Sequence, residues 1–166
     1  MRLTPIALTV AIALATVASA GHGQKPDDQI DPRSAALAQE AQALNAQGKH
    51  QEAVDLLETA LVVDPRNRQA YIGLARAAQA QKLPGKAIKF YFDALKLEPN
   101  DVNALAGQGE ALVERGAVER AKRNLERIKQ LCADPCPQAT QLASVIAKGP
   151  PAEVLTAQRP EVGAPK

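Results

Sequence analysis

Two stretches of the chain repeat one pattern of apolar and polar positions at an offset of 34 residues. AVDLLETALVVDP begins at Ala53 and AIKFYFDALKLEP begins at Ala87, and each ends in an acidic residue followed by proline. Within each stretch the apolar residues recur three and four positions apart, which is the spacing of one face of an α-helix. A period of this length predicts helix–turn–helix units that bury their apolar faces against neighbouring units.

The closing prolines Pro65 and Pro99 set the boundaries of three units, 34–67, 68–101 and 102–135. Small residues occupy matched positions in these units, where two helices must approach closely: Ala41, Ala75 and Gly109 in the first helices, and Ala53, Ala87 and Ala121 in the second. We expect Ser34, Asn67 and either Asn100 or Asp101 to cap the helices that follow the acidic-proline pairs. No run of alternating apolar and polar residues suggests a strand, so the predicted fold is all-α.

This pattern resembles the tetratricopeptide repeat (TPR) family over roughly residues 34–135. The chain departs from the family pattern where Leu37 and Leu105 replace a large ring, and at Glu40 and Gln108, where the family prefers leucine. The resemblance implies a right-handed superhelical stack of three units. One further helix is predicted over residues 137–147, with Leu142 and Ile146 on the face that would cover the exposed end of the third unit.

The resemblance also implies a binding groove on the concave side of the stack, lined by the first helix of each unit. Carried onto this chain, the groove positions are Gln42, Asn45, Gln69, Ile72, Arg76, Gln79, Asn103 and Glu110. Amide side chains can pair with the backbone of an extended peptide, although they can also simply solvate a surface. Ala38 stands where some family members carry the first lysine of a clamp for a C-terminal carboxylate.

The first 20 residues have the features of a secretory signal peptide. Arg2 gives the positive start, residues 6–17 the apolar run, and residues 18–20 a cleavage site of small residues. We expect cleavage after Ala20 and a periplasmic or secreted mature protein, the alternative being an uncleaved anchor. Polar, proline-containing residues 21–33 are predicted to be flexible and 148–166 to be a disordered tail, which leaves residues 34–147 as one domain.

Cys132 and Cys136, in the sequence CADPC, are the two cysteines of the chain. In an oxidising compartment they are candidates for a disulfide, since Asp134 and Pro135 force a turn between them. A thiol–disulfide exchange centre is the less favoured alternative, because redox motifs separate their cysteines by two residues. For a metal site, only His22 and His50 could join the thiolates, and both are remote in sequence, so we expect neither metal nor cofactor.

The charges and aromatic residues suggest two further surfaces. Removing Arg2 with the leader leaves 19 of 20 basic residues against 18 acidic ones, so the near-neutral chain gives no reason to expect nucleic acid as a partner. The second helix of the third unit is basic; it could hold an anionic envelope polymer or lipid headgroup, but ion pairs on a solvated face are favoured.

All four aromatic residues lie in the middle unit: Tyr71, Phe90, Tyr91 and Phe92. We expect Tyr91 to be buried and one phenylalanine to be a candidate for self-association.

No nucleophile beside a base, paired carboxylates or phosphate-binding loop is evident, so we expect no enzymatic activity. The leading hypothesis is a scaffold or adaptor of the cell envelope that binds a peptide or partner protein in its concave groove, as the resemblance to the TPR family implies. The alternative is a self-associating structural protein, a homodimer formed through the aromatic middle unit. After cleavage of the leader we expect no stable insertion into a membrane. The identity of the partner is not encoded in the repeat pattern.

Overall fold

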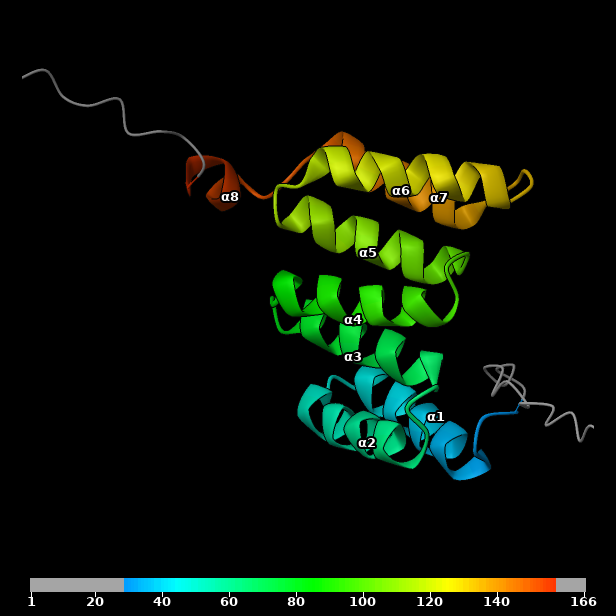
Figure 1. The fold of residues 1–166 in the computed structure, drawn as a ribbon. Helices are drawn as coiled ribbons and strands as arrows, with labels where there is room; N and C mark the ends of the chain where they lie inside the picture. Colours follow the sequence, from blue (N-terminus) through cyan, green and yellow to red (C-terminus); the bar gives the residue numbers. More distant parts are fainter. Residues whose placement is uncertain (1–28, 158–166) are drawn as a thin grey trace, which may run out of the picture.

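The computed structural model describes residues 29–157 as a stack of helical hairpins (Figure 1). The helices of this part of the chain are α1 (Pro32–Ala46), α2 (His50–Val63), α3 (Arg68–Ala80), α4 (Pro84–Leu97), α5 (Val102–Glu114), α6 (Val118–Leu131), α7 (Pro137–Lys148) and α8 (Ala152–Ala157). The described residues contain no strand. The predicted all-α stack of three hairpins followed by a further helix is confirmed. The predicted leader with its cleavage site, His22 and residues 158–166 lie outside the described residues.

Small residues set the distance between the helices of each hairpin. Ala53, Ala87 and Ala121 are each completely buried, and each occupies the fourth position of the second helix of its hairpin. Their N–H groups donate to the carbonyl oxygens of Lys49, Leu83 and Ala117, respectively. The three alanines therefore occupy equivalent places, as the 34-residue offset predicts. A larger side chain at any of them would separate the paired helices.

Large side chains from the second helices fill the junctions between hairpins. Leu57 of α2 packs over Gly73 of α3, and Tyr91 of α4 packs over Gly107 of α5. A Cβ atom placed on Gly107 would lie 2.3 Å from the Cζ atom of Tyr91. Glycine is needed at Gly107 because the tyrosine ring occupies the volume that any side chain would take. Tyr91 is 2% exposed, which confirms the burial predicted for it.

Two of the predicted helix caps are confirmed and one is wrong. The Oδ1 atoms of Asn67 and Asp101 accept hydrogen bonds from the backbone N–H groups of Ala70 and Ala104, at 3.2 and 2.8 Å. Ser34, in contrast, lies inside α1, which begins at Pro32 and is capped by Asp31. The buried Ser34 hydroxyl donates to the Ala60 carbonyl at 2.7 Å and accepts from Asn67 Nδ2 at 2.8 Å. Ser34 therefore links α1 to α2 and to the start of α3.

Helix α7 covers the end of the third hairpin. Helix α7 packs against α5 and α6, and its Leu142 is completely buried over Gly109.

Helix α8 lies within the segment that we expected to be disordered from residue 148 onward, so that expectation is wrong for residues 152–157. Pro151 precedes this helix, and Ala152 and Glu153 begin it, which is a favourable sequence for a helix start. None of the helices within residues 29–157 has the length and apolar character needed to cross a bilayer.

Candidate peptide-binding groove

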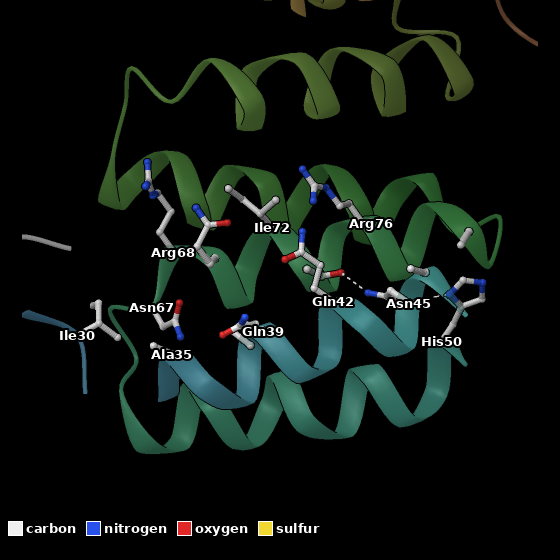
Figure 2. Close-up of a pocket in the computed structure, with 15 residues that line it drawn as sticks. Ile30, Ala35, Gln39, Gln42, Asn45, His50, Asn67, Arg68, Ile72 and Arg76 are labelled. Atoms are coloured by element: carbon white, nitrogen blue, oxygen red, sulfur yellow. Dashed lines mark hydrogen bonds between the residues drawn. The ribbon is translucent and has the colours of Figure 1, made fainter. Parts of the chain in front are cut away.

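A cavity of about 670 Å³ lies between α1 and α3 and reaches His50 at the start of α2. It extends along both helices, from Ile30 and Arg68 at one end to His50 and Ala80 at the other (Figure 2). The residues that line it are Ile30, Ala35, Ala38, Gln39, Gln42, Asn45, Ala46, His50, Asn67, Arg68, Gln69, Ile72, Gly73, Arg76 and Ala80. We call this cavity the α1–α3 groove.

Carboxamide side chains line the α1 side of the groove. Gln39, Gln42 and Asn45 are three residues apart, which places them on one face of the helix. Asn45 Nδ2 donates to the carbonyl oxygen of Gly73 on α3 at 3.4 Å, and Asn45 Oδ1 lies 3.1 Å from His50 Nδ1. Since this amide oxygen only accepts, the proton of a neutral His50 is on Nδ1 and its Nε2 atom is an acceptor. Asn45 therefore holds the imidazole at one end of the groove.

A line of three residues one helical turn apart forms the α3 side of the groove: Arg68, Ile72 and Arg76 (Figure 2). Ile72 is 2% exposed and belongs, with small residues such as Ala38, to the apolar floor. Arg68 forms an ion pair with Asp101, the residue that caps α5. Arg76 is exposed to solvent. The lining thus combines an apolar floor, amides on one wall and positive charge on the other.

Five of the eight groove residues predicted from the sequence line this cavity: Gln42, Asn45, Gln69, Ile72 and Arg76. Gln79 does not. Its Oε1 atom accepts a hydrogen bond of 2.9 Å from the Tyr91 hydroxyl, and its Nε2 atom donates to Glu114 at 3.4 Å. Burial raises the pKa of Tyr91 to about 12, which keeps the hydroxyl protonated as a donor. Gln79 therefore satisfies the polar end of a core residue.

The two predicted residues of the third hairpin also lie outside the cavity. Gln138 Nε2 donates to Asn103 Oδ1 at 3.0 Å, and Gln141 Nε2 donates to Glu110 Oε1 at 2.7 Å. Burial raises the pKa of Glu110, and the hydrogen bond from Gln141 opposes this shift. Both Gln138 and Gln141 come from α7, which packs against α5 as the first helix of a fourth hairpin would. Helix α7 therefore binds the polar side chains of α5 that we predicted to bind a ligand.

Sequence reasoning missed several lining residues: Ile30, Gln39, His50, Asn67, Arg68 and Gly73. Gln39 lies three residues before Gln42, so helical spacing alone could have identified it. Ile30 precedes the first predicted unit and His50 begins a second helix, so no position rule for first helices includes them. Within residues 29–157, no group of three or more His, Cys, Asp or Glu side chains is placed to hold a metal ion.

Comparisons with known proteins agree with the repeat pattern. A family model described as tetratricopeptide repeat matches residues 44–92, which cover parts of the first and second hairpins. The first TPR of Spaghetti (RPAP3), bound to the HSP90 peptide SRMEEVD, has the same fold, with a TM-score of 0.64 and 24% identity over 70% of this chain and 91% of that one. Residues 44–92 therefore match the tetratricopeptide repeat, and the helical stack shares its fold.

Two further matches extend the TPR comparison. The Yersinia enterocolitica type III secretion chaperone SycD, in complex with a peptide of the translocator YopD, superposes with a TM-score of 0.61 and 19% identity over 75% of this chain and 94% of that one. A barley (Hordeum vulgare) protein named as a probable peptide N-acetylglucosaminyltransferase, SPINDLY, is 30% identical over 95 residues, or 57% of this chain. The match spans 10% of that protein. The superposition on SycD shows a shared fold.

The outer surfaces of the TPR stack carry the remaining candidate sites. Phe92 is 56% exposed, with the Lys96 ammonium 5.4 Å from its ring centre, so it is the aromatic residue left on the surface. Self-association through Phe92 stays a prediction. On the basic helix α6, Lys122 pairs with Glu119 at 2.7 Å and Lys129 pairs with Glu126 at 2.9 Å. These exposed pairs favour a solvated face over a polyanion site.

Proposed function

We propose that this chain is a non-enzymatic interaction scaffold and that the α1–α3 groove binds an extended segment of a partner protein. The observation that carries the proposal is the 670 Å³ cavity with an apolar floor and a wall of carboxamides. Gln39, Gln42 and Asn45 offer both donors and acceptors, which the backbone of an extended chain requires. The peptides bound to RPAP3 and SycD support this mode by analogy of fold.

The dimensions of the groove fit a short segment. Helix α3 has 13 residues, which at a rise of 1.5 Å per residue gives a length of roughly 20 Å. An extended chain advances about 3.3 Å per residue, so roughly six residues span the groove. Ordering such a segment costs free energy, which offsets part of what burial of its side chains in the groove contributes. We therefore expect affinities of the order of micromolar.

A substitution that fills the groove tests this proposal. Ala35 and Ala36 are adjacent, exposed residues of α1, and only Ala35 lines the cavity. Peptides selected from a random phage-display library on the full chain should bind Ala35→Trp at least roughly tenfold more weakly, because the indole occupies the space of the peptide. The matched control, Ala36→Trp, should bind as the parent does.

Titration calorimetry and thermal melts of the three proteins would measure affinity and folding together. Selected peptides that bind the parent and Ala35→Trp with equal affinity would place the binding site elsewhere on the stack and overturn the proposal.

We further propose that the scaffold works outside the cytoplasm, in the periplasm or after secretion, as a component of the cell envelope. Two observations support this. The apolar run that follows Arg2 is typical of a cleaved leader. Cys132 and Cys136 lie with their Cα atoms 5.9 Å apart and their Sγ atoms within bonding distance, as an oxidised pair requires.

Intact-mass measurement of the protein recovered from its native compartment tests this second proposal. The expected species begins at Gly21 and lacks two hydrogens, because the leader is removed and the two thiols are oxidised. Closing so short a loop contributes only about 2 kcal/mol. The double variant Cys132→Ser, Cys136→Ser should therefore melt at a lower temperature and still bind peptide. A native species that retains Met1 and two free thiols would contradict the compartment.

A further inference from the structure

The charged residues that line the α1–α3 groove have one sign. Arg68 and Arg76 carry positive charge, and no aspartate or glutamate lines the cavity. A cleft lined by one sign of charge raises the local concentration of groups of opposite charge. The chemistry of the lining therefore favours a segment that carries a carboxylate.

The two arginines differ in what their charge faces. Arg68 is paired with Asp101, whose side chain is 5% exposed, so its charge is matched within the protein. Arg76 is exposed, and no ion pair of residues 29–157 includes it. Burial raises the pKa of Tyr91, and the positive charge of Arg76 together with a hydrogen bond between the two side chains opposes this shift, so Arg76 lies beside the Tyr91 hydroxyl. Arg76 is thus the groove cation best placed to receive a partner's charge.

Two carboxylates of α5 also influence this region, but each has another partner. Glu110 accepts a hydrogen bond from Gln141, and Glu114 accepts one from Gln79. Burial and the neighbouring charge of Glu114 raise the pKa of Glu110, whereas the hydrogen bond from Gln141 and the positive charge of Arg76 lower it, so Glu110 lies within reach of the Arg76 charge. Neither glutamate lines the groove. Arg76 is nevertheless exposed and lines the groove, so a carboxylate of a bound segment can approach it in addition to Glu110.

The spacing of Ile72 and Arg76 matches the repeat of an extended chain. Four residues of helix advance about 6 Å, and two residues of an extended segment advance about 6.6 Å. Side chains two positions apart in an extended segment point to the same side. If one apolar side chain of a bound peptide lies on the floor at Ile72, the peptide side chain two positions further along therefore lies beside Arg76.

We propose that the groove selects an internal aspartate or glutamate placed two residues from an apolar residue in an extended peptide segment, with Arg76 binding the carboxylate. This inference rests on the proposed function. The groove continues on both sides of Arg76, toward Arg68 in one direction and toward Ala80 in the other, so the chain has room to extend on both sides of the acidic residue. The acidic residue is therefore internal. Arginine suits this role because its planar guanidinium binds both oxygens of a carboxylate.

Blocked peptides separate an internal carboxylate from a chain terminus. The probes are acetylated, amidated and fluorescein-labelled nonapeptides of serine and alanine with a central Leu-Ser-X sequence, in which X is Glu, Gln or Lys, together with the reversed X-Ser-Leu set. Anisotropy titrations use the full chain at low and high salt. For at least one order, the Glu probe should bind about tenfold more tightly than the Gln probe, and Lys should bind most weakly. Salt should reduce the difference, because Arg76 is exposed.

Variants assign the discrimination to Arg76. Arg76→Gln should bind the Glu and Gln probes equally, and Arg76→Lys should keep only part of the preference. Arg123→Gln is the matched control, since it removes one exposed positive charge from α6, away from the groove, and should keep the full preference. Melting temperatures of all variants should equal that of the parent.

Each contrary result overturns the inference in a distinct way. Equal binding of the Glu and Gln probes, or no binding of either, contradicts selection of an acidic residue. If Ala35→Trp still weakens binding of the display-selected peptides, the proposed function stands without this inference. Binding only of an unblocked peptide would assign the site to a terminal carboxylate. Light scattering that shows a dimer dissociated by the Glu probe would make a second copy the natural occupant.

Discussion

Replacing Tyr91 with alanine is expected to lower the free energy of unfolding by about 3–5 kcal/mol. The tyrosine ring fills the junction between the second and third hairpins, where it lies against Gly107 and belongs to a buried cluster with Ile72 and Ala87. Truncation removes these contacts and leaves a cavity that glycine at the facing position cannot fill. A loss of this size is a large fraction of the stability of a small domain.

Urea unfolding followed by circular dichroism measures this loss, with Tyr91→Phe as the control. Phenylalanine keeps the ring and loses only the hydrogen bond of the hydroxyl to Gln79, so we expect a cost of about 1 kcal/mol. If the two substitutions cost the same, the hydroxyl network and not the ring would be the source of stability at this junction.

Replacing Leu142 with alanine is expected to cost about 3 kcal/mol and to act mainly at the C-terminal end of the stack. Leu142 is completely buried, and it packs where a Cβ on Gly109 would lie 2.6 Å from its Cδ2 atom. It contacts a cluster that includes Leu105 and Ile128, so truncation loosens α7 from both helices of the third hairpin. Ala106, which α7 helps to cover, would then become exposed to water.

Hydrogen exchange resolved by peptide measures where stability is lost. Amides of α7 and α5 should exchange faster in Leu142→Ala, and those of α1 and α2 should be unchanged. Leu155→Ala, at a residue of α8 that is 53% exposed, is the control and should change stability by less than about 0.5 kcal/mol. Uniformly faster exchange in all helices would mean that the stack unfolds as one unit.

Periodicity made the packing of this chain predictable. Ala53, Ala87 and Ala121 recur at a fixed offset, and a residue that recurs in every unit experiences the same environment in each. The prediction that Ser34 caps a helix was wrong because the capping rule considers only nearby residues. The Ser34 hydroxyl instead donates to the Ala60 carbonyl of the next helix. Local rules identified the helices but not which polar side chain would join two of them.

The groove was predictable only in part, for a similar reason. The groove positions carried over from the TPR resemblance place Gln42 and Arg76 on the concave side, and both line the cavity. The resemblance places Asn103 and Glu110 there too, but α7 supplies glutamines that bond to them. Whether a concave surface stays open depends on which element packs against the last hairpin. That is a property of tertiary structure, and no repeat pattern contains it.

The contacts between helices join elements that are close in the sequence. Helix α1 packs against α2 and α3, and the same relation recurs along the chain to α7. A chain with this arrangement has few distant segments to bring together, so little loop entropy opposes its assembly. Each hairpin can close soon after it emerges during synthesis, and the next can add to it. The protein can thus be built in the order of its sequence, without waiting for its C-terminus.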